Sequence, residues 1–179
     1  MIAIVTGLWV TVAVVLLMAL VGAWFSWTAT RLDQLHHRID LGRESLNTQL
    51  ALRSGVVLEL VGSGALDDPE AVLLSDAAHR ARHAPEAQAQ SGLSQVLRAV
   101  FASPESVAAV RAEAPELVDE LAAACRKVEL ARRFHNDHVT SARALRSRRR
   151  VRWFRLAGHA PEPTTVDLDD VPPAGLDGR

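Results

Sequence analysis

The chain has 179 residues and a formal net charge of −1, a length that suits one domain and an additional segment. Its single cysteine, Cys125, excludes an intramolecular disulfide. Charge is distributed in blocks: residues 1–30 carry no charged side chain, residues 31–158 carry 19 of the 20 basic residues, and the last 21 residues hold five acids and one base. Such asymmetry indicates separate functional zones.

Residues 1–28 are predicted to form a transmembrane anchor, because residues 2–27 are an almost continuous apolar run. A helix rises about 1.5 Å per residue, so roughly 20 residues cross a hydrocarbon core of about 30 Å. Trp24, Phe25 and Trp27 end the run, where an aromatic belt is expected. A cleaved signal peptide is disfavoured for two reasons. No basic residue precedes the run, and the run is longer than the apolar core of a signal peptide, which has only about 7–15 residues.

The orientation of this anchor follows from the basic residues beside it. Arg31, Arg38 and Arg43 come after the apolar run, and no basic side chain comes before it. Basic residues favour the cytoplasmic side of a membrane. The sequence therefore predicts a single-pass protein of the plasma (inner) membrane, with its N-terminus outside and its C-terminal domain in the cytoplasm.

Residues 29–157 are predicted to form a helical bundle in the cytoplasm. The first helix covers residues 28–61, continues directly from the anchor and stops at Gly62-Ser63-Gly64. Its apolar residues recur at spacings of three, four and seven, which is typical of one buried helical face. They are Leu32, Leu35, Ile39, Leu46, Leu50, Val57 and Leu60.

Capping residues and prolines divide the rest of this domain into further helices. Asp67, Ser103 and Pro115 stand at the expected helix starts, with Ser103 as a cap and a break expected at Pro85. The predicted helices span 68–83, 86–102, 105–112 and 115 to about 152. The predicted fold class is therefore all-α, with one N-terminal transmembrane helix continuing into an antiparallel helical bundle.

Residues 158–179 form an acidic, proline-rich tail. Its composition predicts a segment that is disordered or loosely docked, because it offers few apolar groups to bury.

A basic segment ends the last predicted helix. If short turns make successive helices alternate in direction, this helix runs back towards the membrane. Each arginine near anionic lipid then contributes about 1 kcal/mol to membrane binding. The segment is therefore predicted to be a second membrane contact. Pairing with the acidic tail, solvation, a protein partner and nucleic acid are the alternatives, with nucleic acid the least favoured. Its residues are Arg146, Arg148, Arg149, Arg150, Arg152, Trp153, Phe154 and Arg155.

Histidines near residue 137 are the best candidates for a metal site. His135 and His138 share a helical face next to Asp137, and antiparallel pairing could bring Asp40 and Glu44 level with them. The set falls short of the four carboxylates and two histidines of a catalytic di-metal bundle. Surface or boundary histidines are the favoured interpretation, and no metal is predicted.

No catalytic constellation is present in the sequence. There is no phosphate-binding glycine loop, no dinucleotide-binding fingerprint and no CxxC motif. Cys125 lies among alanines on the apolar side of its helix, which favours a small core residue over a nucleophile. We predict neither enzymatic activity nor a cofactor.

Two stretches resemble the LemA family of bacterial membrane proteins. The first runs from Arg31-Leu32-Asp33 through Leu50-Ala51-Leu52-Arg53 to Leu60-Val61, and the second is Ala131–Val139 with Arg132, Phe134 and Asn136, in which His135 replaces a tyrosine. The resemblance covers about half of the chain and is that of a divergent, actinobacterial branch. It implies a bundle with the N-terminus outside and partners in the envelope. A bond from Asn136 to the first helix and an exposed Asn136 are equally compatible with the sequence.

The predicted function is a membrane-anchored helical scaffold or adaptor that presents its bundle to a membrane or envelope protein partner. One alternative is a homo-oligomeric structural membrane protein. The small-residue pairs Gly7/Thr11 and Ser26/Thr30 would suit helix association in lipid. The second alternative is a nucleic-acid-binding membrane protein, whose binding would weaken steeply with salt.

Overall fold

The computed structural model describes residues 2–84, 86–147 and 162–176, without the side chains of residues 2–6, 8, 10, 11, 25 and 28–36. Within these ranges the chain contains helices and no strands, which confirms the all-helical prediction. The helices are α1 (Ile2–Gly62), α2 (Asp68–His83), α3 (Ala87–Val100), α4 (Pro104–Glu113) and α5 (Pro115–Arg146).

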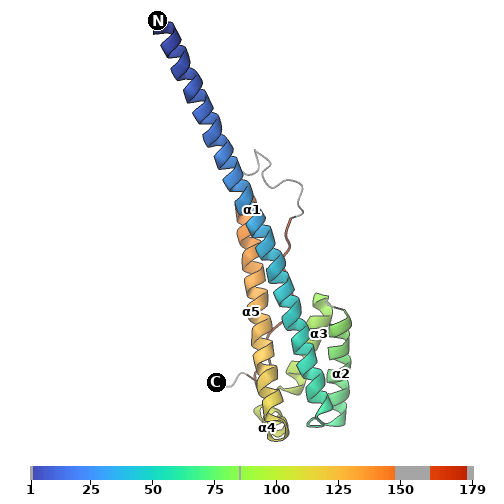
Figure 1. The fold of residues 1–179 in the computed structure, drawn as a ribbon. Helices are drawn as coiled ribbons and strands as arrows, with labels where there is room; N and C mark the ends of the chain where they lie inside the picture. Colours follow the sequence, from blue (N-terminus) through green and yellow to red (C-terminus); the bar gives the residue numbers. More distant parts are fainter. Residues whose placement is uncertain (1, 85, 148–161, 177–179) are drawn as a thin grey trace.

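Helix α1 is one continuous helix of 61 residues, and the predicted continuity between the apolar run and the first helix of the bundle is therefore confirmed. It ends at Gly62, and Gly64 then adopts a φ of +77°, a left-handed conformation that glycine allows at little cost. The N-terminal half projects beyond the other helices (Figure 1). Among the residues with described side chains, no helix is long and apolar enough to cross a bilayer, so the predicted span gains no support here.

The shorter helices begin where caps and prolines predicted. Asp67 is the N-cap of α2, with Pro69 in the first turn. At α4 the Ser103 hydroxyl accepts a hydrogen bond from the Ser106 backbone N–H at 3.1 Å. This side-chain cap satisfies one of the donors that a helix start leaves unpaired.

Helix α5 lies antiparallel to the C-terminal half of α1 (Figure 1). Ile39 packs with Val139 and Ala142 near the end of α5. Nearer the start of α5, Val128 packs with residues further along α1. The end of α5 therefore points towards the projecting half of α1, as the geometric argument predicted.

Helix α5 is shorter than predicted, because it ends at Arg146 and not near Arg152. Ser147 follows as the C-cap, and its hydroxyl donates to the Ala144 carbonyl at 2.9 Å. Serine offers the backbone such local bonds in place of the next helical bond, which favours a helix end here.

The predicted apolar face of α1 is buried wherever its side chains are described. Val57 and Leu60 are fully buried in the main core, which all the helices share, and Leu46 and Leu50 form a second cluster with α5. Cys125 is 2% exposed in the main core, as predicted for a small core residue.

Of the two states predicted for the tail, disorder is wrong for residues 162–176, and docking is the one that the structure shows. This C-terminal segment lies extended along the bundle, with Leu168 and Leu176 buried. Composition alone indicated a solvated chain, because the acids and prolines outweigh the apolar residues. The bundle reverses this balance by offering arginines to the acids and apolar sites to the leucines.

Candidate functional site: the docked C-terminal segment

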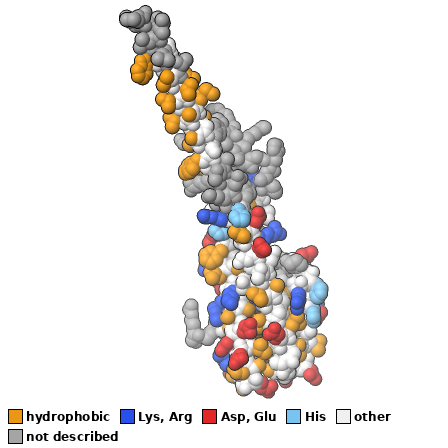
Figure 2. All heavy atoms as spheres, in the orientation of Figure 1, with side chains coloured by type: hydrophobic (Ala, Val, Ile, Leu, Met, Phe, Trp, Pro, Cys, Tyr) orange, Lys and Arg blue, Asp and Glu red, His pale blue; other side chains and the backbone are white. Residues whose placement is uncertain are grey.

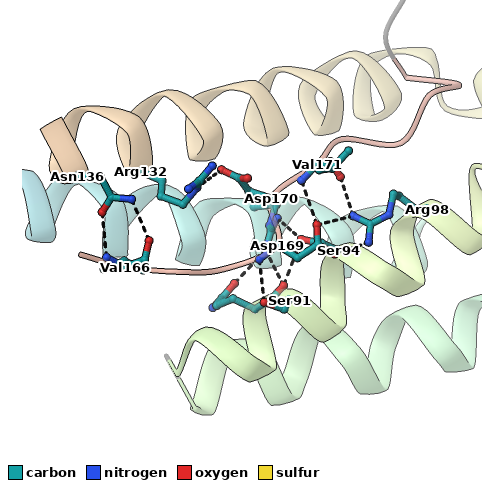
Figure 3. Close-up of polar contacts among 11 residues, drawn as sticks. Ser91, Ser94, Arg98, Arg132, Asn136, Val166, Asp169, Asp170 and Val171 are labelled. Carbon is teal, nitrogen blue, oxygen red and sulfur yellow. Dashed lines mark hydrogen bonds and ion pairs between the residues drawn. The ribbon is translucent and has the colours of Figure 1, made fainter. Parts of the chain in front are cut away.

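The C-terminal segment (residues 162–176) gathers most of the long-range polar contacts of the described chain. It runs between α3 and α5, with α1 behind it (Figure 3). Its direction is opposite to that of α5: Arg143 bonds to Pro163, and Arg132 bonds to Asp170. The segment thus joins three helices of the bundle through one extended stretch of chain.

Asn136 holds the upstream part of this segment by two hydrogen bonds. Its Nδ2 donates to the Val166 carbonyl at 3.0 Å, and its Oδ1 accepts from the Val166 backbone N–H at 2.9 Å. The side-chain amide of Asn136 therefore bonds to both the N–H and the carbonyl of Val166, as the backbone of an adjacent strand would do in a sheet. Neither predicted interpretation of Asn136 is correct, because it bonds to the C-terminal segment rather than to α1 or to solvent alone.

Asp169 forms a two-pronged ion pair with Arg98 of α3. Nη1 donates to Oδ1 at 2.9 Å and Nη2 donates to Oδ2, while Nη1 also donates to the Val171 carbonyl at 3.0 Å. The Asp169 backbone N–H donates to the Ser91 hydroxyl at 3.0 Å. Hydrogen bonding by Arg98 lowers the pKa of Asp169, and the same bond raises the pKa of Arg98.

The next residue, Asp170, pairs with Arg132 of α5. Arg132 Nε donates to Asp170 Oδ2 at 2.5 Å, and the Asp170 side chain is only 6% exposed. Its hydrogen bond with Asp170 raises the pKa of Arg132. A carboxylate at this depth needs such a partner, because an unpaired buried charge is strongly destabilising.

Beneath these pairs, Arg53 of α1 is buried to 1% exposure. Its guanidinium donates to Ser94 Oγ at 2.9 Å and to both the backbone and side-chain oxygens of Gln90 at 3.1 Å. Arg53 Nε has no hydrogen-bond partner among the described residues. Burial lowers the pKa of Arg53, and the charges of Asp170 and Asp169 are among those that oppose this effect.

Leucines anchor the segment at two places. Leu168 packs against Leu46 and Val128, and Leu176 enters the main core. Gly175 permits the second anchor, because a Cβ there would lie 2.6 Å from Val107 Cγ2 and 3.0 Å from the Phe101 carbonyl oxygen. Any side chain at position 175 would therefore push the segment away from α3 and α4.

A pocket lies beside the segment. It has a volume of about 400 Å³ and lies between α1, the start of α3 and residues 164–168, with Arg43 and Asn47 on its wall. This volume is within the range of sites that hold small groups, and both polar and apolar atoms line it.

The predicted surface or boundary position of His135 is wrong, because the packing of α1 against α5 buries it. His135 is buried at 2% exposure, contrary to the predicted surface position, and neither ring nitrogen has a hydrogen-bond partner among the described residues. A Cβ on Gly42 would lie 3.5 Å from His135 Cα, so the two helices approach closely there. In the described part of the chain, no three His, Cys, Asp or Glu side chains group around a possible metal position.

Of the predicted membrane-interface residues, only Trp24, Trp27 and Arg146 have described side chains. Trp24 and Trp27 are exposed on the projecting half of α1, and Arg146 is partly buried at the end of α5. The side chains of Phe25 and Arg31 lie outside the described residues. So do Arg148, Arg149, Arg150, Arg152, Trp153, Phe154 and Arg155.

Three of the four family-motif residues surround the C-terminal segment. Arg132 and Asn136 bond to it directly, Arg53 lies beneath it, and Phe134 is 54% exposed. The sequence contained a signal for Arg53, because it falls on the buried face between Leu50 and Val57. Ser91 and Arg98 gave no such signal, since only the folded chain brings them beside the segment.

Comparison with protein-family models, with curated proteins and with solved structures gives no match for this chain. The LemA resemblance therefore stays a prediction.

Proposed function

We propose that this protein is a membrane-anchored adaptor of the plasma membrane, with the N-terminal half of α1 in the bilayer and the bundle on the cytoplasmic side. One observation carries the proposal: apart from Ser26, the described side chains of this half are apolar and exposed. Trp9, Leu17 and Met18 are 70%, 62% and 70% exposed. Figure 2 shows hydrophobic side chains along the projecting part and charged ones on the bundle.

Lipid would remove this apolar surface from water at a gain of roughly 25 cal/mol per Å². Soluble monomers rarely expose continuous apolar patches beyond a few hundred Å². The apolar run in the sequence is long enough for a span, and a helix satisfies its own backbone in lipid. The arginines that follow the run support an inward orientation of the bundle.

Extraction from membranes tests the anchor. The full chain should stay in the membrane pellet after alkaline carbonate treatment, and Leu16→Arg combined with Leu17→Arg should release it. Leu52→Arg is the matched control, because Leu52 is an exposed leucine on the bundle half of α1 and should leave extraction unchanged. Release of the unmodified chain by carbonate would overturn the anchor, and a C-terminal reporter active only outside the cytoplasm would overturn the orientation.

The basic segment at residues 146–155 is proposed to contact anionic lipid, because the end of α5 points towards the proposed anchor. Trypsin cleaves after arginine, so anionic nanodiscs should protect this segment more than neutral ones. Cleavage at Arg111 and Arg126, which are exposed on the bundle, should not depend on lipid charge. Equal cleavage of the segment in both kinds of nanodisc would contradict the contact.

An adaptor must bind another protein. Affinity purification of the full chain in mild detergent, followed by mass spectrometry, should recover a membrane or envelope protein in stoichiometric amount. Recovery of this chain alone, as a stable oligomer, would contradict the adaptor and favour a homo-oligomeric structural protein.

A further inference from the structure

Arginines from three different helices surround two adjacent carboxylates of the C-terminal segment. Arg98 of α3 pairs with Asp169, Arg132 of α5 pairs with Asp170, and both carboxylates act electrostatically on the buried Arg53 of α1 (Figure 3). We call Arg53, Arg98 and Arg132 the arginine cluster. Because it is assembled by the helices, it belongs to the bundle, whereas the two carboxylates come from an extended segment beside it.

The arginine cluster favours an anionic occupant. Arg53 is buried with only neutral groups as hydrogen-bond partners, Ser94 and Gln90, among the described residues. A guanidinium stays protonated at any physiological pH. Without the carboxylates of the segment, the cluster would hold three positive charges, and Glu129 of α5 would still act on one of them, Arg132. The remaining excess of positive charge favours the binding of negative charge.

The C-terminal segment has the properties of a peptide ligand. It is extended, and side chains of the helices recognise its backbone: Asn136 at Val166, Ser91 at Asp169, and Arg98 at Val171. Leu168 immediately precedes the carboxylate pair and supplies an apolar anchor. Extended peptides are commonly bound by this combination of backbone hydrogen bonds and side-chain pockets.

The fit of this segment is incomplete. The pocket of about 400 Å³ beside residues 164–168 remains open next to Arg43 of α1. A peptide that fills this space as well would gain contacts that the chain's own segment does not make.

We propose that the arginine cluster is a binding site for an acidic, extended peptide of a partner protein, and that the C-terminal segment is an intramolecular occupant which this peptide displaces. The recognised pattern is an apolar residue followed directly by two carboxylates, as in Leu168-Asp169-Asp170. This peptide would be the part of the partner protein that the proposed adaptor recognises, so the inference rests on the proposed function. Because the occupant is tethered, it competes at an effective concentration in the millimolar range.

A labelled synthetic peptide with the sequence of residues 162–176 tests the site on the full chain in detergent micelles. The released-tail variant carries Leu168→Ala, Asp169→Asn and Asp170→Asn, which remove one anchor and both ion pairs of the tethered segment. Fluorescence anisotropy should show the peptide binding at least tenfold tighter to this variant than to the unmodified chain. Equal affinity for the two proteins, including no binding to either, would overturn the proposal.

Two controls identify the site. Adding Arg98→Gln to the released-tail variant should reduce peptide affinity at least tenfold, and a peptide with asparagine at both acidic positions should bind equally weakly. Binding that is indifferent to either change would place the peptide elsewhere. Circular dichroism establishes that each variant is folded. If the released-tail variant does not fold, Asp169→Asn alone serves, because the side chain of Asp169 is 32% exposed, and a smaller gain of about threefold is expected.

Light scattering distinguishes a second copy from a partner protein. If the segment of one copy docks on another, the unmodified chain will be a dimer that dissociates in the released-tail variant, and the proposed partner peptide will be wrong. An unchanged oligomeric state supports intramolecular docking. Peptide binding in micelles and resistance to carbonate extraction are independent measurements, so failure of this inference is distinguishable from failure of the proposed anchor.

Discussion

The two halves of α1 share one continuous backbone but lie in opposite surroundings. In the half next to the bundle, Leu46, Val57 and Leu60 are at most 1% exposed, because α5, α2 and the C-terminal segment cover that face. In the projecting half, the apolar side chains with described exposure remain open, including Leu17 at 62%.

This difference follows from how apolar residues are placed around the helix. The bundle half carries one apolar face, which a few neighbouring elements are enough to cover. The projecting half is apolar on all sides, so only an apolar environment that surrounds it would cover it. The same helix thus combines a packed element with the proposed membrane element. The following four predictions test that contrast and the cover that the C-terminal segment provides, from the largest expected effect to the smallest.

A truncated leucine should have very different costs in the two halves. Leu60→Ala should lower the free energy of unfolding of the bundle by about 2–5 kcal/mol, because it leaves a cavity in the core. Leu17→Ala is the matched change in the projecting half and should alter the free energy of unfolding by less than about 0.5 kcal/mol. Urea denaturation in micelles, followed by circular dichroism, measures both. Equal costs would show that the projecting half is also packed within the fold.

The buried ion pair of the C-terminal segment should contribute more than an exposed one. Asp170→Asn should destabilise the folded chain by about 2–3 kcal/mol, because it leaves Arg132 without its carboxylate in a mostly buried place. Asp119→Asn breaks the exposed pair with Arg111 and should cost less than about 1 kcal/mol. Chemical denaturation compares the two. A similarly small loss of unfolding free energy in both variants would mean that docking of the segment on α1 contributes little to stability.

Two glycine-to-alanine substitutions should change the stability of the folded chain in opposite directions. Gly175→Ala should destabilise docking of the segment by about 1–3 kcal/mol, because the added methyl group meets Val107 and a backbone carbonyl. Gly55→Ala, in the bundle half of α1, meets no atom within 4 Å and should stabilise the chain by about 0.5–1 kcal/mol through helix propensity. Thermal melts decide the signs, and a neutral Gly175→Ala would contradict the close approach at the end of the segment.

The smallest effect is a pH dependence below the usual titration range of aspartate. The pKa of Asp169 is lowered from 3.8 in the folded chain, so its ionised form stabilises docking. This stabilisation is fully present above pH 3.8 and is lost as the pH falls through the lowered value. Urea titrations of the unmodified chain and of Asp169→Asn should therefore differ at pH 6 and converge as the pH falls through the lowered pKa of Asp169. A difference that does not change with pH would exclude the charge of Asp169 as its source.

Most of the helices could be predicted from the sequence, because they depend on interactions between residues that are close along the chain. Helix starts followed from Asp67, Ser103 and Pro115, and the buried face of α1 followed from the spacing of its leucines and valines. These features depend on residues within a few turns of one another, which a single sequence displays directly. The end of α5 was placed too late, because the terminal turn depends on weak local competition at Ser147.

The tertiary structure alone decided the candidate site. Asp169 meets Arg98 across 71 residues of sequence and Asp170 meets Arg132 across 38, so no local pattern indicated either pair. The same holds for His135, whose burial results from the close approach of α5 to Gly42. Composition left disorder and loose docking open for the acidic, proline-rich segment, since it cannot bury itself. Its docking depends on apolar sites and arginines that exist only after the helices have assembled.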